Sequence, residues 1–289
     1  MNNDHPPIRP PSEAHSTLLR ITEGCSYNGC TFCPAYKNIP FTIRSAKQIK
    51  QTLLSIASGH RASKRLFLCD GDALTVPQDR LTETMAMIHQ ILPEVKSIRT
   101  YANAKSVSTK SDEQLRTLRQ DGLKVVHMGL ESGDDVTLKR LNKWGTAQEI
   151  ITQAKRLRQV RIKLFVTVLL GAGGTQRSDQ HARFTADALS QIDPEYIGAL
   201  TLMPYRGTPL YEQCANGTFT LPSPKALLGE LKTVLENLTL SRGLFFANHA
   251  SNYLPLNVRL PGGKDQALKL IEHALGDQSA LKPEWMRGL

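Results

Sequence analysis

Six short apolar runs of the kind that forms buried strands recur between residues 17 and 202, and a helical pattern follows each of them. This alternation is typical of parallel βα units, because two parallel neighbours need a long crossover connection between them. The expected strands are Thr17–Thr22, Arg65–Cys69, Ser97–Tyr101, Leu123–Leu130, Lys163–Leu170 and Tyr196–Leu202. The pattern predicts an α/β fold and favours a partial (βα)6 barrel of the TIM type. A doubly wound open sheet shows the same alternation and stays an alternative.

Paired polar residues mark where two of the helices begin. Thr146 with Glu149 and Ser111 with Gln114 form capping boxes, and Gly122 is expected to end the second of these helices. Apolar residues at helical spacing predict further helices at residues 81–92, 227–238 and 268–275, with a short strand at 244–246.

The length of 289 residues suits one large α/β barrel domain with a substantial core. We expect residues 1–16, which contain four prolines, to form a loose leader. Residues 17–210 would form the barrel, and residues 211–289 would form a C-terminal extension that helps to close its mouth.

Composition narrows the cellular setting and the partners. No apolar run approaches the roughly 20 residues of a membrane span, and residues 1–16 contain no apolar core of a signal peptide, so a cytoplasmic protein without membrane contact is expected. The net charge of +10 favours an anionic partner, which leaves RNA and phosphorylated or carboxylated small molecules open. A basic run at residues 155–163 is better explained by the favourable place of cations at the end of a helix than by RNA binding. The oligomeric state is not predicted.

Three of the five cysteines, Cys25, Cys30 and Cys33, lie within nine residues of one another and predict a metal site. Three ligands leave one position of the metal free, as in catalytic rather than structural sites. Cys69 and Cys214 stand alone and are interpreted as small buried hydrophobic residues. Structural zinc is the main alternative, although it normally takes paired CxxC or CxxH ligands, and no second pair is present.

Polar residues and glycines follow each expected strand. In a parallel barrel, the loops after the carboxyl ends of the strands build the active site. Beyond the cysteine loop, the segments concerned are residues 70–72, 102–105, 131–135, 171–174 and 203–209. Glycine lets the backbone approach a ligand closely, and acidic side chains can hold an ammonium group or ribose hydroxyls.

Together these motifs resemble the radical S-adenosylmethionine (SAM) superfamily, in the branch of methylthiotransferase-like and Elongator-catalytic-subunit-like enzymes. The resemblance covers residues 17–210. It implies that Cys25, Cys30 and Cys33 bind a 4Fe-4S cluster whose fourth iron takes the amine and carboxylate of SAM. An electron from the cluster would then cleave SAM to methionine and a 5′-deoxyadenosyl radical that abstracts hydrogen from the substrate.

The same resemblance implies roles for residues in the other loops. Phe32 would contact adenine, and the Gly71–Asp72 turn would bind the methionine ammonium group through Asp70 or Asp72. Polar side chains after the fourth strand would approach the ribose or carboxylate of SAM, and the end of the fifth strand would contact adenine; the residues concerned are Glu131, Ser132, Leu170 and Gly171.

The spacing of the cysteines departs from the usual pattern of this superfamily. Four residues, Ser26 to Gly29, separate Cys25 from Cys30, where three are usual, and we expect Gly29 to absorb the additional residue in a loop. The fifth-strand motif also lacks its usual closing acid, because Thr175 follows Gly174.

Candidates for substrate contacts come from two later loops. Tyr205 and Arg206 follow the sixth strand, and Asn248, His249 and Asn252 follow the short strand near residue 246. Each of these side chains could instead satisfy the backbone of its loop or lie free on the surface. Neither the substrate nor the catalytic residues are predicted, and an RNA and a small molecule both remain open.

An external one-electron donor such as flavodoxin or ferredoxin is implied by the resemblance. The alternative function is a zinc-containing module that binds RNA or protein on a barrel scaffold.

Overall fold

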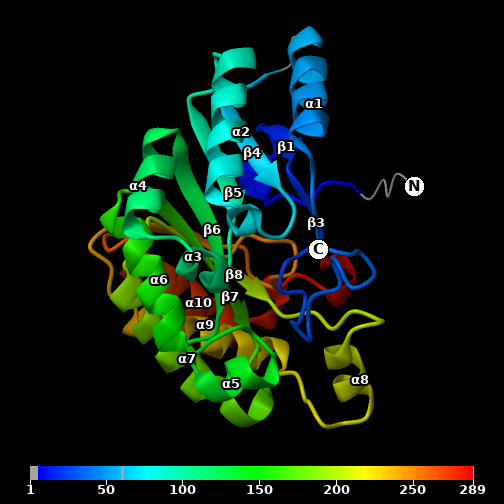
Figure 1. Ribbon diagram of the computed structural model, residues 1–289. Helices are drawn as coiled ribbons and strands as arrows, with labels where there is room; N and C mark the ends of the chain where they lie inside the picture. The colour runs from blue at the N-terminus through cyan, green and yellow to red at the C-terminus, as the bar shows by residue number, and fades with distance from the viewer. Residues whose placement is uncertain (1–5, 60–61, 289) are drawn as a thin grey trace. The chain divides into compact units, whose positions relative to one another are not determined.

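The computed structural model describes residues 6–59 and 62–288, and the chain divides into two compact units (Figure 1). Unit 1 contains the chain up to Asn28 together with residues 35–128 and 156–163. Unit 2 contains residues 29–34, residues 129–155 and the chain from Leu164 onward.

Unit 1 is built on parallel strands that pair in the order β1, β4, β5, β6. Helices α1 and α2 lie side by side (Figure 1). A short antiparallel pair, β2 with β3, precedes α1. The bounds are β1 Thr17–Arg20, β2 Thr22–Glu23, β3 Thr42–Ile43, α1 Ala46–Ser58, β4 Arg65–Cys69, α2 Gln78–Ile91, β5 Ser97–Tyr101, α3 Ala104–Ser108, α4 Asp112–Gln120 and β6 Leu123–Glu131, of which the last three residues belong to unit 2.

Unit 2 contains β7, β8 and β9, which pair in parallel, and β10, which pairs with β9 in the antiparallel direction. Helix α9 packs against α7 and α10. The bounds are α5 Asp135–Arg140, α6 Ala147–Gln159, β7 Lys163–Leu170, α7 Gly174–Ile192, β8 Tyr196–Thr201, α8 Pro209–Ala215, α9 Pro224–Asn237, β9 Gly243–Phe246, β10 Asn257–Leu260 and α10 Lys264–Gly276; α6 and β7 each have one end in unit 1.

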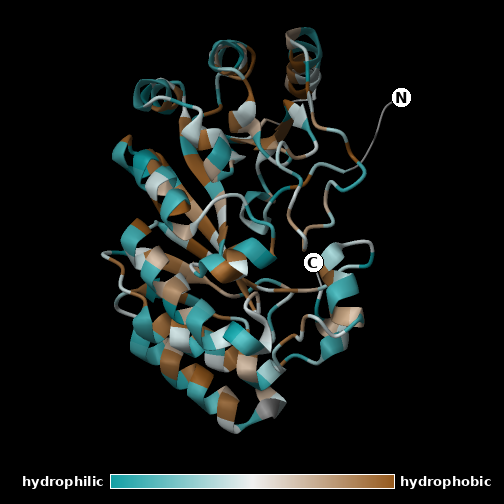
Figure 2. Ribbon diagram, turned by 60° about the horizontal axis from the view of Figure 1, so that its bottom comes forward, coloured by the Kyte–Doolittle hydropathy of each residue, from teal (hydrophilic) through white to brown (hydrophobic). Residues whose placement is uncertain are grey.

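Hydrophilic and hydrophobic residues alternate along the helices (Figure 2). This pattern is expected for helices that pack one face against a hydrophobic core and expose the other face to water. In α2, for example, Leu81, Met85 and Ile88 are buried at helical spacing. Within the described residues, no helix combines the length and the apolar character needed to span a membrane.

The expected strands agree closely with those observed, and both capping boxes are present. The Ser111 and Gln114 pair opens α4, and Thr146 exchanges hydrogen bonds with Glu149 at the start of α6. Strand β10 was not predicted, because it has only four residues before Pro261 and its alternation is too short to recognise in sequence.

The start of the described chain is more ordered than the loose leader expected from its prolines. Residues Pro11–Glu13 form a turn of 3-10 helix, and the Glu13 side chain is fully buried. Its carboxylate accepts hydrogen bonds from Ser16 Oγ at 2.5 Å and Arg99 Nη1 at 2.9 Å, and His127 Nε2 lies 3.6 Å away. An ionic anchor therefore ties residues 11–16 to β5 and β6. The first five residues of the expected leader lie outside the described residues.

This anchor makes a prediction about stability in acid. Burial raises the pKa of Glu13, but hydrogen bonds from His127, Ser16 and Arg99 outweigh it and lower the pKa from 4.5 to about 2. Because the folded pKa lies below the unfolded one, the stabilisation is fully present above pH 4.5 and is lost as the pH falls toward 2. The shift corresponds to about 3 kcal/mol at neutral pH.

The measurement is the free energy of unfolding in urea at several pH values for the wild-type protein and Glu13→Gln. We expect the difference in free energy of unfolding between the wild type and Glu13→Gln to shrink as the pH falls from 4.5 toward 2. The contributions of other carboxyl groups cancel in this difference. A difference that does not change with pH would contradict the role given to Glu13.

Candidate functional site

The loops that follow the parallel strands of unit 1 start from one edge of its sheet. Arg20 at the end of β1 is paired with Cys69 at the end of β4, and Leu68 is paired with Thr100 near the end of β5. The residues after these strands, from Ile21, Asp70 and Ala102 onward, therefore share an edge. In unit 2, Leu170 at the end of β7 pairs with Thr201 at the end of β8. The loops after these two strands therefore also start side by side.

Cys25 lies directly against the turn that follows β4. The Gly71 amide donates a hydrogen bond to the Gly24 carbonyl oxygen at 3.0 Å. A Cβ at position 71 would lie 2.7 Å from the Cys25 Cβ and 2.9 Å from its Cα, distances that real Cβ atoms do not adopt. Only glycine at position 71 therefore allows Cys25 its observed position.

Asp72 joins the loops that follow three strands of unit 1. Its Oδ2 atom accepts hydrogen bonds from Ser26 Oγ at 2.6 Å, Thr75 Oγ1 at 2.7 Å and Asn103 Nδ2 at 2.8 Å. Its Oδ1 atom accepts a hydrogen bond from Ser106 Oγ at 2.6 Å. Ser26 follows Cys25 in sequence, so this carboxylate fixes the chain next to the first cysteine.

The environment of Asp72 makes it a structural acceptor. The side chain is fully buried, and burial raises its pKa, whereas hydrogen bonds from Ser106, Ser26 and Thr75 act in the opposite direction. Asp70 is also fully buried, in a left-handed conformation with φ of 70°, and its carboxylate lies 3.0 Å from Arg20 Nε. Both acids suggested for the SAM ammonium group thus have protein partners.

Cys30 and Cys33 belong to unit 2, in the segment 29–34. The Thr31 amide donates to the Leu141 carbonyl oxygen at 2.9 Å, and the Leu210 amide donates to the Thr31 carbonyl oxygen at 3.1 Å. Asn142 Nδ2 adds a hydrogen bond to the Gly29 carbonyl oxygen at 2.8 Å. Hydrogen bonds on both sides of Cys30 therefore hold its segment in place.

Phe32, between these cysteines, packs against an apolar cluster in unit 2. The cluster consists of Leu141, Leu169, Ala172, Leu202, Leu210 and Phe219. Leu169 is near the end of β7 and Leu202 follows β8, so Phe32 lies close to the carboxyl ends of these strands. Its ring remains partly exposed.

Glu131, at the end of β6, forms an ion pair with a residue that sequence reasoning missed. Its Oε1 atom lies 2.9 Å from Lys143 Nζ, and both side chains are almost buried. Glu131 has a φ of 64°, and a Cβ at Gly129 would lie 2.0 Å from its Oε1 atom. Gly129 thus provides the space that this ion pair occupies.

Ser132, Leu170 and Gly171 are the other predicted contacts of SAM in unit 2. Ser132 is fully buried, and its Oγ atom lies 2.7 Å from His181 Nδ1. Leu170 is buried at the end of β7. The Gly171 amide donates to Glu230 Oε1 at 2.5 Å, and its φ of 85° suits glycine.

The candidates for substrate contacts fall into two groups. Tyr205 is half-buried, and burial raises its pKa, whereas Arg206 and Asn248 are exposed. His249 is half-buried, with Nδ1 at 2.9 Å from Ser251 Oγ, and burial lowers its pKa.

Asn252 differs from the other candidates because its amide is fully engaged inside the protein. Its Nδ2 atom donates to the carbonyl oxygens of Ala199 and Ala247, and its Oδ1 atom accepts from Thr201 Oγ1 at 2.8 Å. Asn252 therefore fastens the loop after β9 to the end of β8.

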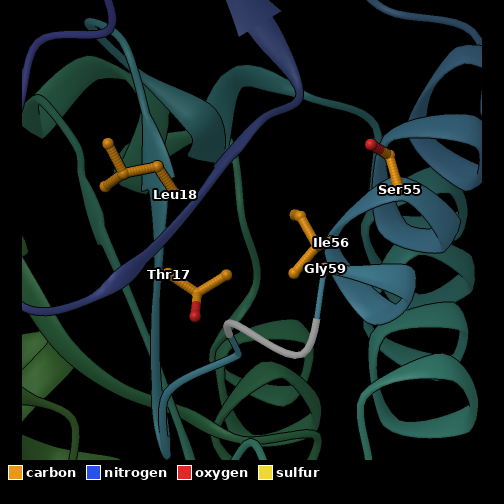
Figure 3. Close-up of a pocket in the computed structure, with 5 residues that line it drawn as sticks. All are labelled: Thr17, Leu18, Ser55, Ile56 and Gly59. Carbon is orange, nitrogen blue, oxygen red and sulfur yellow. The ribbon is translucent and has the colours of Figure 1, made fainter.

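A hollow lined by Thr17, Leu18, Ser55, Ile56 and Gly59 lies between β1 and α1 (Figure 3). Thr17 is the first residue of β1, so the hollow lies at the opposite end of this strand from the loop that leads to Cys25. Parallel α/β proteins bind ligands at the carboxyl ends of their strands. The hollow is therefore not part of the candidate site.

Thiolates are suitable ligands for an iron-sulfur cluster, and Cys25, Cys30 and Cys33 are partly exposed and form no disulfide. Among the described residues, no group of three or more His, Cys, Asp or Glu side chains is arranged to hold a metal ion. Cys25 is in unit 1 and the other two cysteines are in unit 2. We therefore treat the three cysteines as one ligand set because of their spacing in the sequence.

Sequence reasoning missed several residues that order the site, among them Lys143, Ser106, His181 and Glu230. A signal was present for Glu230, which lies three residues after Leu227 and four before Val234, on the buried face of α9. A carboxylate on an apolar helix face indicates a specific partner. Lys143, Ser106 and His181 had no such signal.

The chain matches the family described as the Radical SAM superfamily over residues 19–186, more than half of its length. It is 19% identical over 166 residues to the heme chaperone HemW of Bacillus subtilis (strain 168), which covers 57% of this chain and 43% of that protein. It is 21% identical over 238 residues to the tRNA-2-methylthio-N(6)-dimethylallyladenosine synthase of Rickettsia canadensis (strain McKiel), with coverage of 80% and 51%. The chain thus spans about half the length of these curated relatives.

Among solved structures, the chain is similar to the radical S-adenosylmethionine methyltransferase TsrM from Kitasatospora setae, which was solved with cobalamin and a 4Fe-4S cluster bound. The TM-score is 0.56 and the identity 21%, and the match covers 72% of this chain and 41% of that chain. At this identity the similarity shows a shared fold.

Proposed function

Because the chain belongs to the radical SAM superfamily, we propose that it binds a 4Fe-4S cluster through Cys25, Cys30 and Cys33 and cleaves SAM reductively. The observation that carries this proposal is the presence of three cysteines within nine residues, inside the segment that matches the family. When bound, a cluster of this kind supplies the electron for SAM cleavage, and the resulting 5′-deoxyadenosyl radical abstracts hydrogen from a substrate.

We assign Asp72 the task of ordering the loops of unit 1. Its oxygens already accept hydrogen bonds from Ser26, Thr75, Asn103 and Ser106, so it shapes the turn in which Gly71 makes room for Cys25. The methionine part of SAM would then lie along the backbone of this turn. Asp70, paired with Arg20, supports the same turn.

Residues of unit 2 would hold the nucleoside part of SAM. Phe32 and the apolar cluster behind it offer apolar surface for adenine, and the turn at Leu170 and Gly171 would contact the same ring. Glu131 and the loop at Ser132 would face the ribose or the carboxylate, and Lys143 orients the Glu131 side chain.

The substrate would meet the loops after β8 and β9. Exposed Arg206 and Asn248, with half-buried Tyr205 and His249, offer a cation and hydrogen-bonding groups, whereas Asn252 holds the second loop in place. The net charge of +10 suits an anionic substrate, which includes both RNA and a phosphorylated or carboxylated small molecule. One relative is named as a tRNA-modifying synthase, which supports trying RNA first.

An external one-electron donor such as flavodoxin or ferredoxin would reduce the cluster. Five cysteines, three of them in one loop, suit a reducing compartment better than a disulfide framework, and we propose the cytoplasm.

The test is anaerobic reconstitution with iron and sulfide. We expect a brown protein with about four irons, as the 4Fe-4S cluster type requires, that forms 5′-deoxyadenosine from SAM when reduced with dithionite. Bulk tRNA and a low-molecular-weight extract are then added separately, and the fraction that increases 5′-deoxyadenosine formation identifies the substrate class.

Zinc in place of iron, with no cleavage of SAM, would end the proposal. That result would instead support the zinc-containing binding module.

A further inference from the structure

A buried carboxylate on α9 contacts the loops that follow two strands of unit 2, one of them through a histidine. The Glu230 side chain has no exposed surface, and Oε1 accepts the Gly171 amide at 2.5 Å. Oε2 accepts a hydrogen bond from the Ser178 hydroxyl. His181 Nε2 lies 3.4 Å from Oε1. Glu230 therefore acts directly on the turn after β7.

The second connection runs through His181 to the loop after β6. His181 is 1% exposed, and its Nδ1 atom lies 2.7 Å from Ser132 Oγ. The Asp134 amide donates to the same Oγ atom at 3.0 Å, so the serine hydroxyl hydrogen is available for Nδ1. We assign the ring hydrogen to Nε2, which places an N–H group toward the Glu230 carboxylate.

The turn at Gly171 is held by α9 at two points. Besides the hydrogen bond to Glu230, a Cβ at position 171 would lie 2.9 Å from Leu227 Cδ2. Leu227 and Glu230 are three residues apart and so lie on one face of the helix. This face of α9 holds the backbone of the turn through the packing of Leu227 and through the hydrogen bond to the Glu230 carboxylate.

We propose that Glu230 is a positioning residue, which holds Gly171 directly and Ser132 through His181 in the arrangement that SAM requires. This inference rests on the proposed function, in which the loops at these two residues contact SAM. Glu230 lies outside the family match of residues 19–186, so a part of the chain beyond that segment would help to order its cofactor site.

The chemistry explains why a carboxylate is present where neighbouring positions of α9 are apolar. A buried carboxylate is unfavourable unless it is fully hydrogen-bonded, and an apolar residue here would pack at least as well. The carboxylate therefore serves to fix the geometry of the groups around it, which are the Gly171 amide, the Ser178 hydroxyl and the His181 ring.

Glu230→Gln is the informative variant because it keeps the size of the side chain. Its amide oxygen can take the place of Oε1 beside Gly171 and His181 Nε2, but it carries no full charge. Its NH2 group then takes the place of Oε2 and cannot accept the hydrogen bond from the Ser178 hydroxyl. The control is Glu236→Gln on the same helix, where the glutamate is exposed and lies 3.5 Å from Lys232.

The kinetic readout is the KM for SAM and the kcat in 5′-deoxyadenosine formation by the cluster-loaded proteins. We expect Glu230→Gln to raise the KM about tenfold at an unchanged iron content, as loss of a supporting residue around a site typically does. Glu236→Gln should match the wild type. A Glu230→Gln variant with lower thermal stability and a wild-type KM would overturn the inference, because its role would then be structural only.

A second readout needs neither cluster nor SAM. In the apo-protein, ¹⁵N NMR of the imidazole should report the Nε2–H form of His181 in the wild type and a changed ring signal in Glu230→Gln. An unchanged signal would also overturn the inference. Absence of SAM cleavage by the wild-type protein would instead contradict the proposed function, so the two failures are distinguishable.

Discussion

Cys30→Ala will leave the reconstituted protein almost free of iron and unable to form 5′-deoxyadenosine. Two cysteines do not replace three in holding a cluster, and no other cysteine lies near this loop in sequence. The measurement is iron and sulfide content after anaerobic reconstitution, with the visible absorbance of the cluster as a second readout. We expect both to fall to background.

Cys69→Ala and Cys214→Ala are the matched controls and should bind iron as the wild type does. Burial, with Asp70 nearby, raises the pKa of the Cys69 thiol to about 12, so it stays protonated and is a poor ligand. Cys214 packs against the apolar cluster around Phe219, and burial raises its pKa as well. Iron retained by Cys30→Ala, or lost from Cys69→Ala, would show that the ligands are assigned incorrectly.

Gly71→Ala will strongly reduce cluster loading although it adds only one methyl group. The new Cβ would lie 2.7 Å from the Cys25 Cβ and 3.0 Å from the Gly24 carbonyl oxygen, so the first cysteine must shift. Overpacking of this kind costs about 1–3 kcal/mol. We expect a moderate fall in the free energy of unfolding and a much larger fall in iron bound per protein.

The control for this variant is Gly276→Ala at the end of α10, where an added Cβ meets nothing within 4 Å. It should leave the iron content unchanged. If Gly71→Ala binds iron normally, then the close contact between the turn after β4 and Cys25 does not govern the cluster site.

Much of the fold was predictable because local patterns and long-range packing agree. The buried runs Arg65–Cys69, Ser97–Tyr101 and Lys163–Leu170 form strands with the expected bounds. The α/β class and the partial-barrel type are confirmed by the parallel pairing and by the solved relatives, and the resemblance to the radical SAM superfamily is confirmed by the family match.

The candidate site was predictable in its loops but not in the partners of its residues. The position of Asp72 after β4 could be inferred from sequence, whereas its hydrogen bonds from Ser26 and Asn103 connect residues 46 and 31 positions away. Such contacts depend on how the loops fold over the sheet edge, which periodicity and spacing do not encode. The pairing of Glu131 with Lys143 was missed for the same reason.

The shared carboxylate of Asp72 also limits how this chain can change over evolutionary time. Ser26 precedes β4 in the cysteine loop, whereas Asn103 and Ser106 follow β5, yet all three donate to the same two oxygen atoms. A lineage that replaced Asp72 would leave several donors without their acceptor, and it would keep the cysteine loop in place only by changing those positions too. The loops of unit 1 are therefore expected to diverge as one module, whereas an exposed position such as Arg206 carries no such constraint.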